Sequence, residues 1–135
     1  MKSKLKPRWS AKKEIKTLDA LCRRAVFERD NHRCRKCGKD KEKAQLHWAH
    51  IITRAAKSTR WYLPNSMVLC YYHHFRWAHE YPLQFSEWVK KEIGQIAYDE
   101  LILKSNAPYP LNPMSCDQWF QYLVEQGFKY GADNG

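Results

Sequence analysis

Residues 34–74 read CRKCGKDKEKAQLHWAHIITRAAKSTRWYLPNSMVLCYYHH, and this segment contains two pairs of residues with the spacing of zinc ligands. Cys34 and Cys37 are separated by two residues, and so are Cys70 and His73. A tetrahedral structural zinc ion is often held by two ligands from each of two tight turns. The pattern therefore predicts a closed structural zinc site, with ordinary buried thiols as the alternative.

The residues within and beside this segment predict short elements. Residues 30–43 are polar and contain Gly38, which is typical of a turn or knuckle. Residues 45–53 (QLHWAHIIT) and 67–70 (MVLC) are rich in β-formers and predict two strands. A helix is expected to follow over residues 71–80.

Helices are also predicted on both sides of this segment. Apolar residues recur at three- and four-residue spacing over 15–26, and the helix that they predict ends near Asp30. The same rhythm predicts one longer helix over 82–101, opened by a proline. Residues 115–127 predict a last short helix, which begins with a Ser-x-x-Gln capping box and ends at a glycine.

Composition and charge restrict the class of function. The chain has 135 residues, and its 24 Lys and Arg against 14 Asp and Glu give a net charge of +10. Such an excess favours a polyanionic partner, nucleic acid first. Neither a run of about 18 apolar residues nor a signal peptide is found, so we expect no membrane association and a cytoplasmic location. In that reducing compartment, five cysteines favour metal binding over disulfides.

The segment from CRKCG to CYYHH resembles the HNH (ββα-metal) endonucleases, in which a Cys pair, a strand His, a loop Asn and a Cys-x-x-His-His end follow one another. It looks most like the phage-borne group that includes the NinG-like recombination proteins. Their region around the first His is similar to AHIITR (49–54), and their downstream helix is similar to IGQIAYDEL (93–101). The resemblance covers about residues 20–101. It implies an α+β fold with a small, zinc-stapled ββα-metal core and flanking helices.

The resemblance also implies how the chain is divided and what it does. We expect a basic N-terminal arm over 1–13, an HNH core with the structural zinc over 14–80, and a C-terminal helical extension over 81–135 that packs on the core. The implied activity is metal-dependent DNA endonuclease, which hydrolyses phosphodiester bonds with a single catalytic ion and nicks one strand at a time. A homodimer is one arrangement that would cut both strands.

Three residues receive catalytic roles from the resemblance. His50 is the implied general base, Asn65 orients the loop or the base, and His74 binds the catalytic ion. A phosphodiester reacts slowly, so a proton acceptor and a cation beside the phosphate are the chemistry that a nuclease needs. We expect Mg²⁺ or Mn²⁺ as the ion, while imidazole ligands also admit Zn²⁺ or Ni²⁺.

The sequence departs from the common HNH pattern directly before the base. Many members carry an Asp or a His there as a second metal ligand, and this chain has Ala49. His47 is the expected substitute because alternate residues of a strand share a face; a surface histidine without a ligand role is the alternative. Neighbouring residues of a helix point about 100° apart, so His73 and His74 are assigned to different metals, and the reverse assignment stays open.

Two arginines follow the base in the loop. Arg54 and Arg60 are predicted to hold backbone phosphates beside the cut, with plain surface arginines as the alternative. The expected partners are DNA and, by the phage resemblance, recombination or packaging proteins in a bacterial host cytoplasm. A non-catalytic zinc module that binds DNA or a protein partner is the alternative function, because Ala49 removes a usual metal ligand.

Overall fold

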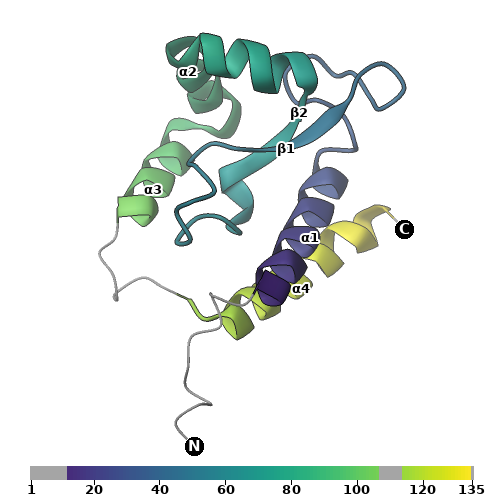
Figure 1. Ribbon diagram of the computed structural model, residues 1–135, viewed down its shortest axis with the longest axis vertical. Helices are drawn as coiled ribbons and strands as arrows, with labels where there is room; N and C mark the ends of the chain where they lie inside the picture. The colour runs from purple at the N-terminus through teal and green to yellow at the C-terminus, as the bar shows by residue number, and fades with distance from the viewer. Residues whose placement is uncertain (1–11, 107–113, 135) are drawn as a thin grey trace, which may run out of the picture.

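A computed structural model describes residues 12–106 and 114–134, and in it the fold is α+β. Its centre is an antiparallel pair of strands, β1 (Leu46–His50) and β2 (Ser66–Cys70). The pairing runs without a bulge from Leu46 opposite Cys70 to His50 opposite Ser66. Helices surround this hairpin (Figure 1). The second strand coincides with its predicted range to within one residue, whereas β1 ends at His50, three residues before the predicted end at residue 53.

One hydrophobic core joins the hairpin to the first and last helices. Helix α1 (Lys12–Arg29) and helix α4 (Cys116–Asn134) lie side by side below the hairpin (Figure 1). Their buried residues meet Trp61 and Val68 in a single cluster. The capping box of α4 is present, since the Gln118 N–H donates to Ser115 Oγ and the Ser115 N–H to Gln118 Oε1. The helix continues to Asn134, however, and the predicted end at residue 127 is wrong.

A second core cluster covers the other side of the hairpin. It contains Ala49, Met67 and Leu69 and is closed by Val89 of helix α2 (Pro82–Ile93). The predicted single helix over 82–101 is instead two, because Gly94 has φ 94° and ends α2 before helix α3 (Gln95–Asn106) begins. A positive φ suits glycine, which has no Cβ.

Two short helical turns flank β2. A 3-10 turn, η2 (Leu63–Asn65), enters the strand. The segment that follows the strand, η3 (Tyr72–Ala78), is a π-helix. The sequence predicts a helix at 71–80, but its periodicity assumes the α-helical repeat. π-helical turns are rare in proteins, and those that occur are often at functional sites. Because a π-helix has more residues per turn than an α-helix, the winding of η3 changes which of its side chains meet.

A buried aspartate ties α1, the knuckle and β2 together. Asp30 accepts hydrogen bonds from both Arg29 and Arg35, with Nε and Nη distances of 2.8 to 3.0 Å. Its Oδ2 also accepts the N–H of Val68. Its side chain is 2% exposed. A buried carboxylate is stable only when it is paired and hydrogen-bonded, and these contacts meet that condition.

Within the described part of the chain, every helix is too short or too polar to cross a membrane. Of the predicted N-terminal basic arm, residues 1–11 lie outside the described residues, and Lys12 and Lys13 belong to α1.

Candidate functional site

Four side chains converge where the knuckle meets the end of β2. Cys34, Cys37, Cys70 and His73, called here the metal cluster, have their ligand atoms all within 4.8 Å of one another. The sulfur atoms of Cys37 and Cys70 are 3.8 Å apart. His73 Nδ1 lies 3.3 Å from Cys70 Sγ and 3.9 Å from Cys34 Sγ. The cluster can hold a metal ion such as zinc.

These distances fit tetrahedral zinc. Zn–S bonds of about 2.3 Å and Zn–N bonds of about 2.0 Å, set at tetrahedral angles, place two sulfurs about 3.8 Å apart and a sulfur and a nitrogen about 3.5 Å apart. The raised pKa of Cys37 also supports a bound cation. Burial, followed by the neighbouring Cys34 sulfur, raises the pKa of Cys37 to about 11. A cation at the centre removes this penalty, because metal binding favours the thiolate.

Cys34 differs from Cys37 in its surroundings. Burial alone would raise its pKa, but backbone N–H groups of Cys37, Cys70 and Lys36 donate to its sulfur and bring the pKa below the usual value. The turns that carry the cysteines therefore also stabilise a thiolate. Such backbone donors are a regular means of lowering a pKa.

A second group of imidazoles lies next to the metal cluster but apart from it. His47 on β1 and His74 on η3, called here the histidine pair, face each other with their Nδ1 atoms 3.1 Å apart. His73 lies with the cysteines of the metal cluster, as the sequence predicts, whereas His74 lies with His47. His47 shares its strand face with Ala49, whose methyl group is buried in the second core cluster. Position 49 therefore offers no ligand, and His47 is placed where a substitute would be needed.

A neighbouring amide fixes the proton on His47. Its Nε2 lies 2.9 Å from Gln45 Oε1. An amide oxygen only accepts, so Nε2 carries the hydrogen and Nδ1 keeps its lone pair towards His74. Metal-bound histidines are commonly oriented by such a bond on the other ring nitrogen. The 3.1 Å spacing fits two nitrogen ligands about 2.1 Å from one ion at an angle of about 95°.

His79 is closer to the histidine pair than an α-helix would bring it. In an α-helix a residue five positions after His74 points about 140° away from it. The π-helical winding of η3 changes this angle, and the ring centroids of His74 and His79 are 5.8 Å apart. Burial first, and then the nearness of His47 and His79, lower the pKa of His74 to about 4. Sequence periodicity could not identify His79, because it does not distinguish π from α winding.

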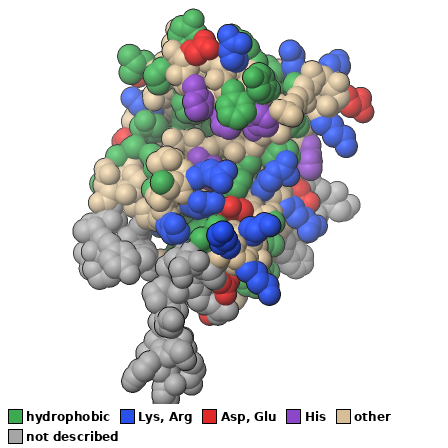
Figure 2. All heavy atoms as spheres, viewed as in Figure 1, with side chains coloured by type: hydrophobic (Ala, Val, Ile, Leu, Met, Phe, Trp, Pro, Cys, Tyr) green, Lys and Arg blue, Asp and Glu red, His purple; other side chains and the backbone are tan. Residues whose placement is uncertain are grey.

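The histidine pair opens into a pocket of about 430 Å³, the histidine pocket. It lies between β1 and α1, and its polar wall includes Arg23, Arg54 and Asp19. On the face shown in Figure 2, histidine side chains lie next to a group of Lys and Arg side chains. The positive charge beside the imidazoles suits an anionic ligand.

His50 lies on the other face of β1 from the histidine pair, with its ring 4.3 Å from that of Trp48. Its Nε2–H donates to the backbone carbonyl of Arg60 over 3.0 Å. This leaves Nδ1 with the lone pair, and Nδ1 is buried without a hydrogen-bond partner among the described residues. Burial first, and then the positive charges of Arg54 and Arg60, lower the pKa of His50 to about 4. The imidazole is therefore neutral at pH 7.

Asn65 is fully buried and holds the loop between the strands. Its Nδ2 donates to the carbonyls of Ile52 and Thr59, and its Oδ1 accepts the N–H of Ile52. These bonds fix both ends of the loop that carries Arg60, whose carbonyl orients His50. Asn65 is a positioning residue for the loop.

The two predicted phosphate-binding arginines differ. Arg54 lines the histidine pocket. Arg60 forms a bidentate ion pair with Asp19, at 2.6 and 2.9 Å, and its guanidinium is mostly buried. Asp19 also accepts the indole N–H of Trp61. Arg60 is thus engaged within the fold, whereas Arg54 is available to a ligand in the pocket.

The aromatic residues of this region divide between core and surface. Trp61 is fully buried, but Tyr71, Tyr72 and Phe75 are about half exposed. Phe75 packs against the rings of both His47 and His74.

No family model matches the chain, and no curated protein or solved structure is significantly similar to it.

Proposed function

We propose that this chain is a metal-dependent DNA endonuclease of the HNH type. The observation that carries the proposal is the histidine pair. Two Nδ1 atoms 3.1 Å apart, one with its tautomer set by Gln45, lie in a pocket beside two arginines. The order β1, β2, η3 around this pair agrees with the strand–strand–helix arrangement that the HNH resemblance implies.

In this proposal the two candidate metal sites have different tasks. The metal cluster holds a structural zinc ion, because four protein ligands leave no position for water or substrate. The histidine pair holds the catalytic ion, with His79 as the next imidazole in reach. Two protein ligands leave coordination positions open. A divalent ion bound there would neutralise charge on the phosphate and its leaving oxygen.

The resemblance assigns the general base to His50, whose ring lies on the other face of β1 from the histidine pair; His50 can therefore serve a water at the ion only after the end of β1 turns its ring towards the histidine pocket. With Nε2–H held by the Arg60 carbonyl, Nδ1 is the atom that accepts a proton from water. A pKa of about 4 keeps the imidazole neutral but makes it a weak base. The negative charge of a bound phosphate raises that pKa, since opposite charges favour the protonated form. Because Nδ1 is buried, water reaches it only after the residues around it move.

Arg54 is the residue that binds the phosphate in this proposal. It lines the histidine pocket, and among the described residues no carboxylate forms an ion pair with its guanidinium. Arg60 contributes through its carbonyl and through its pair with Asp19, which hold His50 and the loop in place. A contact between Arg54 and a backbone phosphate would fix the position of DNA without reading its sequence.

The proposal is tested by nicking of supercoiled plasmid DNA in Mg²⁺ or Mn²⁺. The zinc-loaded wild-type protein should convert it to the open-circular form, and His50→Ala should lower the rate by at least about a hundredfold, the usual effect of a general base. The control is Lys91→Ala, an exposed residue of α2 outside the histidine pocket. Equal nicking by wild type and His50→Ala would overturn the role of His50.

The alternative function is a zinc module that binds DNA without cutting it. The buried Ala49 methyl group is the observation that favours it, since the usual ligand position is lost. In that case the wild-type protein would bind plasmid DNA and leave it supercoiled with every divalent ion tried. That outcome would refute the nuclease proposal.

A further inference from the structure

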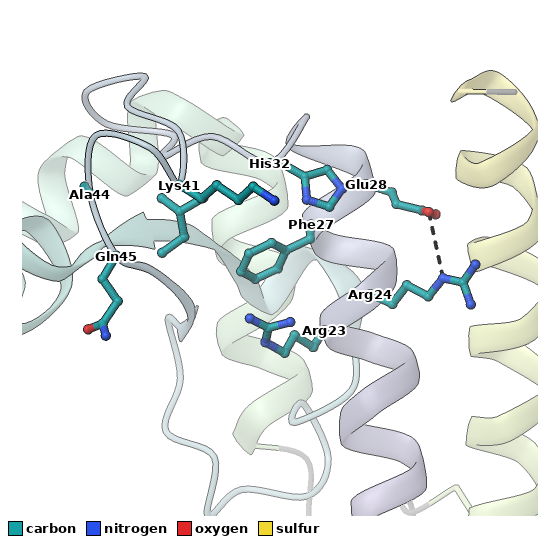
Figure 3. Close-up of a pocket in the computed structure, with 9 residues that line it drawn as sticks. Arg23, Arg24, Phe27, Glu28, His32, Lys41, Ala44 and Gln45 are labelled. Carbon is teal, nitrogen blue, oxygen red and sulfur yellow. Dashed lines mark ion pairs between the residues drawn. The ribbon is translucent and has the colours of Figure 1, made fainter.

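A second hollow lies along α1, beyond the histidine pocket. We call it the α1 pocket; it has a volume of about 570 Å³ and lies between the C-terminal half of α1 and the loop before β1. Arg23, Phe27, His32 and Lys41 line it. In Figure 3 the side chains of Lys41 and His32 lie on one side of the Phe27 ring, and Arg23 lies on the other.

The α1 pocket carries uncompensated positive charge. The guanidinium of Arg23 lies 4.2 Å from the centroid of the Phe27 ring. Among the described residues, neither Arg23 nor Lys41 has an ion pair with a carboxylate, while Arg24 of the same wall pairs with Glu28 at 3.8 Å. Two such cations around one hollow attract an anion, and a guanidinium stacked on an aromatic ring is already held in place.

The backbone at the end of α1 directs a third donor into this hollow. Asn31 and His32 both have positive φ, 58° and 54°. The left-handed region is uncommon for residues other than glycine, although Asn and His adopt it more readily than most. Here the turn sets the His32 ring edge-on to Phe27, with centroids 5.8 Å apart. An imidazole N–H can donate to a phosphate oxygen.

The two pockets share part of their walls. Arg23 and Leu46 line both the histidine pocket and the α1 pocket. An anionic chain that lies in one can therefore pass Arg23 into the other. A DNA backbone carries a phosphate at every nucleotide, whereas a single small anion would occupy only one pocket.

We propose that the α1 pocket is a second phosphate-binding site, which holds the DNA backbone next to the phosphate that is cut. This inference rests on the proposed function, because it places the cut phosphate in the histidine pocket. Arg23 lies between the two phosphates, and Lys41 and His32 hold the further one. The site fixes the direction in which the strand leaves the histidine pocket.

The test measures DNA binding in the absence of cutting. Full-length zinc-loaded His50→Ala protein is titrated into a fluorescein-labelled duplex at several salt concentrations, and anisotropy gives the binding constant. Each lost phosphate contact lowers the slope of log K against log salt by about 0.9. We expect Lys41→Ala, added to this background, to lower the slope by about that amount. Lys41 is exposed, so the variant should fold, which thermal unfolding checks.

Lys91→Ala is the matched control. Lys91 is an exposed lysine of α2, outside both pockets, and its removal changes net charge by the same amount. If Lys41→Ala and Lys91→Ala give the same slope, the inference is wrong. If Lys41→Ala lowers the slope while wild-type protein fails to nick plasmid, the phosphate site stands and the nuclease proposal fails. If wild-type protein nicks plasmid but Lys41→Ala leaves the slope unchanged, the nuclease proposal stands and the phosphate site is refuted.

Discussion

The metal cluster and the histidine pair lie beside the same hairpin, but the metal cluster is a closed set of four ligands and the histidine pair is an open set of two. In the metal cluster four ligand atoms converge from the knuckle, β2 and η3 within 4.8 Å. In the histidine pair two nitrogens face each other across 3.1 Å beside a pocket. A closed shell stabilises a fold, whereas an open one leaves positions for a ligand. In the proposed function, folding and chemistry are therefore assigned to separate ions.

Loss of the closed site should have the largest effect. Cys70→Ser removes a zinc ligand, and because zinc binding in small domains contributes on the order of 10 kcal/mol at pH 7, we expect the protein to lose cooperative unfolding at room temperature. Circular dichroism during a thermal scan measures this. Cys22→Ala is the control, since Cys22 is buried away from the metal cluster. A Cys70→Ser protein as stable as Cys22→Ala would show that no structural metal is bound.

Asp30 tests whether the closed site alone stabilises this side of the molecule. Asp30→Ala leaves Arg29 and Arg35 without their buried partner. Removing one member of a buried pair costs about 3–5 kcal/mol, and the midpoint of denaturant unfolding should fall accordingly while one zinc per chain remains. Glu80→Ala, which breaks an exposed pair with Arg76, is the control and should cost less than about 1 kcal/mol. Equal costs would show that Asp30 is not a structural residue.

Asn65 tests whether the loop between the strands is needed for activity as well as for stability. Asn65→Asp keeps an acceptor for the Ile52 N–H but loses the two donations of Nδ2 to the loop carbonyls. Unsatisfied buried groups cost about 1–3 kcal/mol, and the new carboxyl must also take up a proton to avoid an unpaired buried charge, so we expect a loss of stability that grows as pH rises. A positioning residue should also lower nicking at saturating metal more than Asp30→Ala does in the still-folded protein. A variant that loses stability but keeps the full nicking rate would restrict Asn65 to a structural role.

The smallest expected effect is on the pH dependence of stability. Burial keeps the pKa of His50 at about 4 in the folded protein, against an ordinary value of 6.5. Between these values the unfolded chain binds a proton that the folded chain does not, so stability falls as pH falls from 6.5 towards 4. His50→Gln should show a shallower loss between pH 6.5 and about 5, by urea unfolding. Identical slopes for the two proteins would contradict the lowered pKa.

The sequence predicts the closed site better than the open one, and the reason is local geometry. Cys34 and Cys37 share one turn and Cys70 and His73 another, so their spacing alone restricts where the ligands lie. The histidine pair instead joins two residues 27 positions apart, and its contact depends on the strand register and on the winding of η3. Alternation along β1 nevertheless identifies His47 correctly as the residue that shares a face with position 49.

The features that the sequence did not reveal depend on backbone details. Gly94 interrupts an apolar pattern that runs through it, so the break between α2 and α3 is hidden from periodicity. The π-helical turn brings His79 near His74 for the same reason. Arg60 resembles any surface arginine until the fold places Asp19 beside it. In each case a local pattern is compatible with several structures, and tertiary contacts select one.

Titration of a second metal ion into zinc-loaded protein bears most directly on the presence of two unlike sites. Isothermal calorimetry with Mn²⁺ or Ni²⁺ should find one further ion per chain, bound more weakly than the zinc. His74→Ala and His47→Ala should each abolish that binding and leave the zinc content at one per chain. A wild-type protein that takes up no second ion, or His47→Ala and His74→Ala variants that still bind it, would contradict the open metal site.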